Sequence, residues 1–177
     1  MSFTLYNYVL SGNCYKVRLL ANLLNVTYES VAVDFHPGQE HKSEKFLKIN
    51  PAGTLPIMLV DDLVLTETSA MLVWIAAKFD THKSWWPTDD ANLISEVMQW
   101  LSFASDLTTT VGEARLYSML NREVDIDRVL AGAKRALRLL ESRLTEQSIR
   151  GSGWLVGETP TIADIACFPY TALAPDA

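Results

Sequence analysis

The chain has little cysteine, no excess of positive charge and no long apolar run, and each shortage argues against a class of protein. Its 177 residues include two cysteines, Cys14 and Cys167, whose separation fits neither a disulfide framework nor a metal-ligand spacing. We expect both as free thiols. Fifteen Lys and Arg against 21 Asp and Glu give a net charge of −6, which offers no electrostatic footprint for nucleic acid. No apolar run approaches the roughly 18 residues that a membrane span needs.

The beginning of the chain, MSFTLY, lacks the basic segment of a secretory signal, so we expect a protein of the cytoplasm. The composition, 49% hydrophobic and 20% charged, is ordinary for a globular protein. A chain of this length has room for one large domain or two small ones.

Strand and helix patterns alternate over the first 80 residues. Alternating or continuous apolar runs predict strands, and apolar residues at three- and four-residue steps predict helices. The expected strands are 3–8, 28–33, 55–60 and 63–66, and the expected helices are 17–24, 39–48 and 68–78. The first strand, helix and second strand form a βαβ unit, whose strands should be parallel. The order β-α-β-α-β-β-α is that of a thioredoxin-like domain.

A polar stretch with a proline, at 81–88, interrupts this pattern and predicts a linker between a domain at 1–80 and an all-helical domain at 89–177. After the linker every segment has helical period, and the expected helices are 92–109, 113–120, 125–147 and one that starts at Thr161. Thr161 and Asp164 have the spacing of a capping box. Pro169 lies where this last helix continues and is expected to bend it.

Three short segments carry residues suited to one kind of ligand. They are Ser11-Gly12-Asn13-Cys14, the run NPAGTLP at 50–56, and Glu67-Thr68-Ser69-Ala70. A helix start favours an anion, a strand edge pairs with an extended backbone, and an acid pairs with an ammonium group. Each segment alone has a more ordinary interpretation, because a trans proline at an edge strand and a simple helix cap are common features.

In this order and at this spacing, the three segments resemble the cytosolic glutathione S-transferases, most closely the theta-type and related bacterial enzymes. The run from Trp154 to Asp164 also resembles the helix-capping segment of that family's helical domain. The resemblance implies an α+β thioredoxin-like N-terminal domain followed by an all-α C-terminal domain, and a homodimer. Relatives usually carry one or two helices more, so we expect the helical domain to be incomplete where the sequence stops, at Ala177.

The same resemblance implies that residues in two of the segments bind glutathione. Leu55 would pair its backbone with the cysteinyl amides, and Pro56 would follow a cis bond that turns this edge outward. Glu67 would face the ammonium of the γ-glutamyl group, and Thr68 would bind its carboxylate at the helix start. Thr54 stands where these relatives usually have a lysine, so one cationic contact is replaced.

His41 and Lys42 are the candidates for the glycyl carboxylate of glutathione, since the passage 38–50 looks most like the theta-type enzymes. The alternative interpretation is two solvated residues on a polar helix. The hydrophobic substrate would meet side chains of the helical domain, in a pocket between the domains, although aromatic residues at this spacing are also typical of a core. The candidates are Trp100, Phe103, Arg115 and Tyr117.

Three residues compete to activate the glutathione thiol. Ser11 aligns with the theta-type serine that donates a hydrogen bond to the sulfur, Cys14 with the cysteine of beta-type enzymes, and Asn13 carries an amide donor. The resemblance predicts attack of the thiolate on a hydrophobic electrophile, in detoxification, with no metal and no cofactor beyond glutathione. A disulfide or peroxide reductase that uses Cys14, and a glutathione-binding or protein-interaction module with little catalysis, stay open as alternatives.

Overall fold

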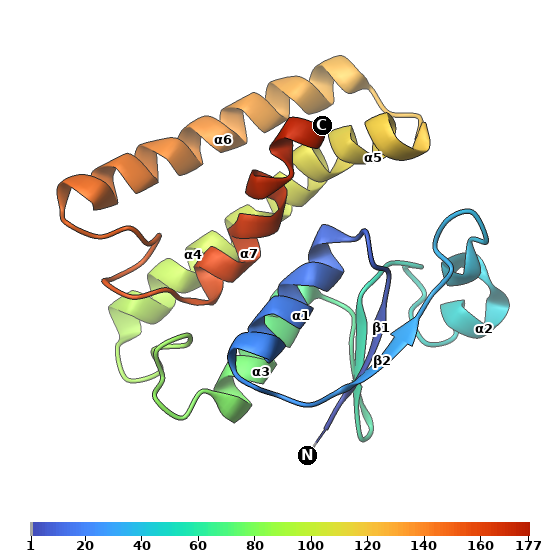
Figure 1. Cartoon of the computed structure of the whole chain (residues 1–177), viewed down its shortest axis with the longest axis horizontal. Helices are drawn as coiled ribbons and strands as arrows, with labels where there is room; N and C mark the ends of the chain where they lie inside the picture. Colours follow the sequence, from blue (N-terminus) through green and yellow to red (C-terminus); the bar gives the residue numbers. More distant parts are fainter. Residues whose placement is uncertain (1) are drawn as a thin grey trace. The chain divides into compact units, whose positions relative to one another are not determined.

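The structure is a computed structural model that describes residues 2–177. The chain forms two compact units, the first up to Phe79 and the second from Asp80 to Ala177. The first contains a sheet and helices, and the second is helical (Figure 1).

The first unit is built around a four-stranded sheet with the order β2-β1-β3-β4. Strand β1 pairs in parallel with β2, whereas β1 with β3 and β3 with β4 are antiparallel. The elements are β1 (Thr4–Asn7), α1 (Gly12–Leu23), β2 (Glu29–Ala32), α2 (Glu44–Leu47), β3 (Ile57–Val60), β4 (Leu63–Leu65) and α3 (Thr68–Phe79). The thioredoxin-like arrangement expected from the sequence is therefore confirmed, as is the helical character of the second unit.

Both faces of the sheet are covered. On one face Val33, Phe46 and Ile57 form a buried cluster, against which Tyr6 packs, so this face is covered by the segment that carries α2. Because side chains alternate along a strand, Leu5 and its register partner Met58 point to the opposite face. Both are fully buried there, together with apolar residues of α1 and α3, which pack against each other (Figure 1).

The polar helix expected at 39–48 is wrong in its length. A 3₁₀ turn, η1 (Glu40–Lys42), is followed by the single-turn helix α2. Ser43 separates them because its backbone is extended, with φ −65° and ψ 151°, and its side chain accepts a hydrogen bond from the backbone N–H of Phe46. A serine in this position favours a helix start over a helix interior, since its hydroxyl competes for backbone donors.

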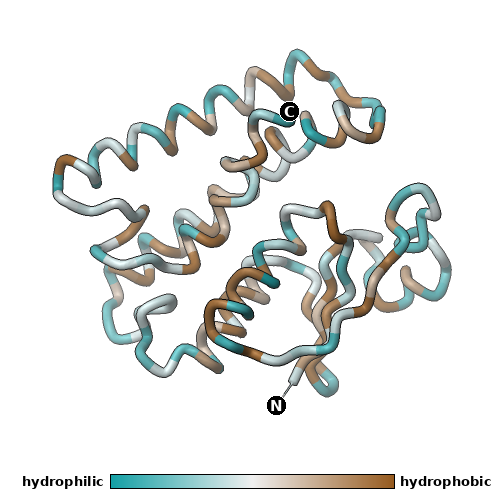
Figure 2. Tube along the Cα trace, viewed as in Figure 1, coloured by the Kyte–Doolittle hydropathy of each residue, from teal (hydrophilic) through white to brown (hydrophobic). Residues whose placement is uncertain are grey.

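The second unit consists of helices and helical turns joined by loops, the longest of which, 150–161, connects α6 and α7. The helices and turns are α4 (Ala91–Leu107), the π-helical turn η2 (Thr108–Gly112), α5 (Glu113–Leu120), α6 (Ile126–Ile149), α7 (Ile162–Ala172) and the 3₁₀ turn η3 (Ala174–Asp176). Polar and apolar residues alternate along α6, as expected for a helix with one buried side (Figure 2). Helix α6 approaches η2 closely at Gly132, where a Cβ atom would lie 2.7 Å from Thr110 Cγ2.

The sequence predicts a break near residue 110, but α4, η2 and α5 follow one another without a loop. The hydroxyls of Thr108, Thr109 and Thr110 donate to backbone carbonyls one turn earlier. Threonines that bond back in this way are tolerated in a helix and often accompany local distortion. The cluster of β-branched residues therefore marks a π-helical turn and not a chain break.

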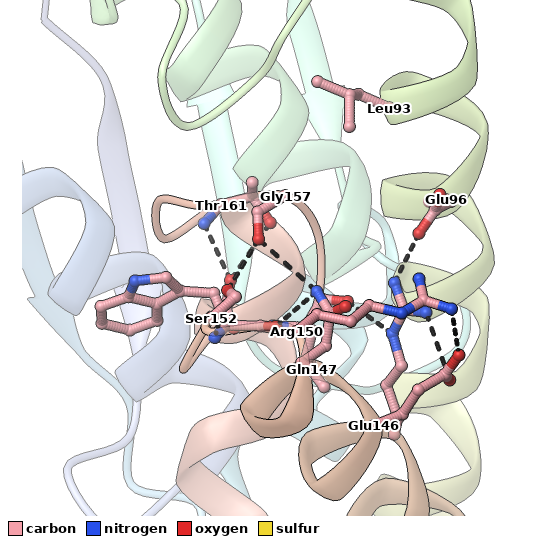
Figure 3. A network of polar contacts seen from close by, with 12 residues as sticks. Leu93, Glu96, Glu146, Gln147, Arg150, Ser152, Gly157 and Thr161 are labelled. Carbon is pink, nitrogen blue, oxygen red and sulfur yellow. Dashed lines mark hydrogen bonds and ion pairs between the residues drawn. The ribbon is translucent and has the colours of Figure 1, made fainter.

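Side chains of α6 hold the loop between α6 and α7 (Figure 3). Gln147, which is buried, donates to the carbonyl oxygens of Trp154 at 3.0 Å and Gly157 at 3.5 Å. Arg143 donates to the carbonyl oxygen of Leu155 at 2.8 Å and pairs with Glu96 of α4 at 2.5 Å. The loop then enters α7 through the capping box of Thr161 and Asp164, which the sequence indicates.

The stretch 81–88 is counted with the second unit, which begins at Asp80. The carboxylate of Asp80 accepts hydrogen bonds from the backbone N–H groups of Trp85 at 2.6 Å and Trp86 at 3.3 Å. The carbonyl oxygen of Trp85 accepts one from Ile162 at the start of α7. Within residues 2–177 no helix combines the length and the apolar character needed to cross a membrane.

Candidate functional site

The pairing of the strands brings the predicted segments of the first unit to one end of the sheet. Tyr6, near the end of β1, pairs with Ile57 at the start of β3, and Leu65 at the end of β4 pairs with Met58. Three segments therefore lie at the same end of the sheet: the loop that leads to Ser11, the loop that ends at Pro56, and the turn from β4 into α3. Because β2 is parallel to β1, the segment from β2 to η1 also starts there.

Ser11 is the N-cap of α1. Its backbone is extended, with φ −77° and ψ 121°, and its side-chain oxygen accepts a hydrogen bond from the backbone N–H of Cys14 at 3.2 Å. A hydroxyl has one donor and two acceptor sites, so this contact leaves the O–H of Ser11 as a donor that can rotate between the sulfur of Cys14 and a ligand. Ser11 is partly exposed, as is Asn13, which follows it in the first turn.

Cys14 lies in the same turn but is fully buried. The backbone N–H of Tyr8 donates to its sulfur at 3.4 Å. Burial raises the pKa of the Cys14 thiol, although hydrogen bonds from Ser11 and Tyr8 and the positive charge of Arg18 act in the opposite direction. A buried thiol with a raised pKa is a poor nucleophile at neutral pH, because the thiolate is the reactive form.

The loop before β3 is organised by Asn50, which the sequence analysis did not single out. Asn50 is almost fully buried, and its side-chain amide donates to the carbonyl oxygen of Thr54 at 2.9 Å and to its hydroxyl at 3.0 Å. Its side-chain oxygen accepts from the backbone N–H of Ala52. The Asn-Pro-x-Gly pattern, typical of an Asx turn, is the signal that could have identified it. The bond between Leu55 and Pro56 is cis.

His41 and Lys42 lie beside this loop. A Cβ atom added to Gly53, whose φ is +58°, would lie 3.2 Å from the backbone oxygen of His41 and 3.4 Å from Nζ of Lys42. The interpretation of His41 as solvated is wrong, because the ring is buried and stacks on Phe35 with centroids 4.0 Å apart. Lys42 is exposed, so its ammonium is available at the loop that carries Thr54 and Leu55.

Glu67 and Thr68 stand where α3 begins. Thr68 is the first residue of the helix, and the carbonyl oxygen of Glu67 accepts the hydrogen bond of Met71. The first backbone N–H groups of a helix have no partner within the helix, so they can bind an anion at this end. The side chain of Glu67 is exposed directly before this point. The carboxylate of Glu67, which can bind a cation, therefore lies next to the backbone N–H groups at the start of α3, which can bind an anion.

The four residues expected around the hydrophobic substrate belong to the second unit and differ in exposure. Trp100 is buried and its ring meets Phe103 edge to face, with centroids 5.0 Å apart. Arg115 is buried, and its Nε lies 3.8 Å from the carboxylate of Asp176. Tyr117 is 45% exposed and can therefore contact a small molecule directly. In residues 2–177, no group of three or more His, Cys, Asp and Glu side chains is arranged to hold a metal ion.

A thioredoxin-like sheet with a serine-capped first helix, followed by a helical unit, defines the class of two-part proteins to which glutathione transferases belong. Family models match both parts: "Glutathione S-transferase, N-terminal domain" over residues 1–77 and "Glutathione S-transferase, C-terminal domain" over residues 123–174. The chain belongs to the glutathione S-transferase family, which is a family of enzymes.

Individual relatives agree with this assignment. The chain is 32% identical to glutathione S-transferase 2 of Schizosaccharomyces pombe, over 95% of this chain and 74% of that protein. It is 29% identical to glutathione S-transferase theta-2B of Homo sapiens, over 84% of this chain and 62% of that protein. A crystal structure of a possible glutathione S-transferase from Rhodopseudomonas palustris has a TM-score of 0.84 and 31% identity, covering 98% of this chain and 82% of that one.

Proposed function

We propose that the end of the sheet described above binds glutathione and that the protein conjugates the glutathione thiolate to a hydrophobic electrophile. The observation that carries this proposal is the position of Ser11 at the N-cap of α1, at the same end of the sheet as the loop of Leu55 and the start of α3. In the proposed complex the backbone of Leu55 pairs with the cysteinyl part of glutathione. Glu67 binds the ammonium, and Thr68 with the start of α3 binds the γ-glutamyl carboxylate.

Lys42 would bind the glycyl carboxylate, since its ammonium lies beside the loop of Thr54 and Leu55. His41 would support this contact indirectly, because its buried ring fixes the turn that carries Lys42. Thr54 would contact the ligand where related enzymes have a lysine. The arrangement gives a donor or a charge for each polar end of the tripeptide and a strand edge between them.

The proposed reaction begins with loss of the thiol proton. A free thiol has a pKa of about 8.5, so only a few per cent is ionised at neutral pH. The O–H of Ser11 would donate to the sulfur and favour the thiolate, and the amide of Asn13 could assist from the same turn. The thiolate then attacks the electrophilic carbon. A carbon–sulfur bond forms, the leaving group departs with its electron pair, and the thiol proton passes to solvent.

We further propose that Trp100, Phe103, Arg115 and Tyr117 contribute to the binding of the electrophile, that the protein is a cytoplasmic homodimer, and that its role is detoxification. These statements rest on membership of the family. Of the four residues, Tyr117 is the best placed for direct contact, because its side chain is exposed, whereas Phe103 is half-buried and the other two are buried. Trp100 and Arg115 would act by shaping the surrounding core.

The reductase alternative requires Cys14 to attack a disulfide, and the burial of Cys14 opposes that step. A glutathione-binding module without catalysis would bind glutathione at the same end of the sheet, but Ser11 would have no role in activating the thiol. Activity towards electrophiles, peroxides and mixed disulfides would separate the three functions.

The test of the transferase proposal is conjugation of glutathione to chlorodinitrobenzene. Ser11→Ala should lower kcat at least roughly tenfold and leave glutathione affinity nearly unchanged, because a hydrogen bond to a charged group contributes about 1.5 to 3 kcal/mol to one ionisation state only. Ser11→Thr should retain much of the activity, and Ser148→Ala, an exposed serine on α6, is the matched control. Wild-type protein that binds glutathione but conjugates no electrophile would contradict the proposal.

A further inference from the structure

Arg18, on the second turn of α1, reaches back across the loop that precedes the helix. One terminal nitrogen donates to the side-chain oxygen of Asn7 at 2.5 Å and to the carbonyl oxygen of Tyr8 at 3.5 Å. The other donates to the carbonyl oxygen of Val9 at 3.2 Å. The guanidinium therefore connects the end of β1, the loop and the helix.

The carbonyl oxygen of Tyr8 has a second donor, the backbone N–H of Ser11, at 3.1 Å. Arg18 and Ser11 thus share one acceptor. This carbonyl oxygen of Tyr8 closes the turn that leads to Ser11. The N–H of Tyr8 points to the sulfur of Cys14. Tyr8 therefore contacts the start of α1 twice, with its carbonyl oxygen at Ser11 and with its N–H at Cys14.

Asn7 in turn holds the side chain of Arg18 in place. Asn7 is buried at the end of β1, and its amide nitrogen donates to the hydroxyl of Ser30 on β2 at 2.7 Å. A planar guanidinium with several donors in fixed directions suits such a three-way contact, whereas a lysine ammonium does not. The chain of contacts from Ser30 through Asn7 and Arg18 ties the loop to the sheet.

We propose that Arg18 is a positioning residue that holds the turn from Tyr8 to Ser11, so that the Ser11 hydroxyl keeps its place at the start of α1. This inference rests on the proposed role of Ser11 in activating the glutathione thiol. Arg18 acts through the backbone of Tyr8 and Val9, and it does not touch the reacting atoms.

The positive charge of Arg18 adds to the effect of its hydrogen bonds. Its charge acts to lower the pKa of the Cys14 thiol in the first turn of α1. A glutathione thiolate held by Ser11 would lie at the same helix start and feel a field of the same sign. Besides Arg18, this part of the chain carries the titratable side chains of Tyr8, Cys14, Tyr15 and Lys16, of which Cys14 and Lys16 are buried. The guanidinium of Arg18 lies 5.7 Å from the centre of the Tyr15 ring.

The experiment compares Arg18→Met, Arg18→Lys and a control, Lys78→Met, which removes one exposed positive charge at the end of α3. For Arg18→Met we expect kcat at neutral pH to fall roughly tenfold, with a rise of about one unit in the pKa of the bound glutathione thiol, measured from the ultraviolet absorbance of the thiolate. KM for glutathione should change little. Arg18→Lys keeps the positive charge but loses the two-pronged set of donors of the guanidinium. The rise in the pKa of the bound thiol should therefore be smaller than for Arg18→Met.

Hydrogen exchange of the backbone over residues 7–14 tests the positioning without reference to activity. Both Arg18 variants should exchange faster there and at the wild-type rate in β3 and α3, whereas Lys78→Met should match the wild type throughout. The inference is overturned if exchange and the pH profile of Arg18→Met equal those of the wild type while Ser11→Ala is impaired. If the wild type conjugates no electrophile, the proposed function fails, and the exchange measurement still decides the role of Arg18.

Discussion

The backbone N–H of Tyr8 donates to the sulfur of Cys14 across 3.4 Å, and Cys14 itself is fully buried. This relationship predicts that Cys14 is unreactive in the folded protein. Because burial raises the pKa of the thiol, iodoacetamide should alkylate it slowly at neutral pH, and the rate should increase only as the pH rises above the usual range for a thiol. The measurement is the alkylation rate of a Cys167→Ala variant, with the urea-unfolded protein as the reference.

The same relationship predicts that Cys14→Ala has a mild effect on conjugation. Rapid alkylation of the native protein, together with a glutathione adduct on Cys14 by mass spectrometry and loss of activity in Cys14→Ala, would favour the reductase function instead.

Asn50→Ala should destabilise the protein and weaken glutathione binding together. The substitution removes both donors to Thr54 and the acceptor of the Ala52 N–H at a buried position. A buried group left without its partner costs about 1 to 3 kcal/mol, which urea unfolding would detect. Calorimetry should show a larger loss of glutathione affinity than the loss of kcat. Asn22→Ala, on the exposed side of α1, is the control, and equal effects of the two substitutions would argue against a role for Asn50 in the loop.

Much of the fold could be predicted because its strands and long helices follow simple periodicity. The stripe along α6 and the capping box at Thr161 are examples in which local pattern and tertiary packing agree. The broken helix at Ser43 and the π-helical turn at 108–112 could not be predicted, since side-chain hydroxyls there decide among backbone conformations of similar energy.

The sequence singles out candidate site residues where a short motif carries them, as at Ser11, Leu55 and Glu67, and their roles in glutathione binding stay predictions. Asn50 and Arg18 were missed for a different reason. Both act through backbone carbonyls of a neighbouring loop. The Asx-turn pattern marks Asn50 as a turn residue but does not show which groups its side chain binds. The spacing of Arg18 does not distinguish it from an ordinary polar residue. Only the three-dimensional contacts show which loop they hold.

Glu67→Gln should weaken glutathione binding roughly tenfold or more, since a hydrogen bond to a charged group contributes about 1.5 to 3 kcal/mol. Glu67 is exposed before the ligand binds, so the loss should lie at the lower end of that range. The control is Asp62→Asn, which removes an exposed carboxylate in the turn between β3 and β4. Thr68→Ala should cost less than Glu67→Gln, because the backbone N–H groups of α3 remain. Calorimetry that shows unchanged affinity would remove Glu67 from the site.

Asp164 should stabilise the second unit in a pH-dependent way. Its carboxylate accepts from the backbone N–H groups of Leu155 at 2.9 Å and Thr161 at 2.8 Å. Asp164→Ala leaves both donors without this partner, so the free energy of unfolding should fall by roughly 2 to 6 kcal/mol, from about 1 to 3 kcal/mol for each group. Asp127→Ala, an exposed carboxylate in the first turn of α6, should change it by less than about 0.5 kcal/mol.

The pH dependence of this effect has a definite sign. Burial is the main influence on Asp164 and raises its pKa above the ordinary value, against the hydrogen bonds from Leu155 and Thr161 that lower it. The folded state therefore binds the proton more strongly than the unfolded state, and stability falls as pH rises from the ordinary aspartate pKa through the raised one. The difference in unfolding free energy between wild type and Asp164→Ala should thus be largest at the acidic end of this window. A difference that grows with pH would mean that the hydrogen bonds to the carboxylate outweigh its burial.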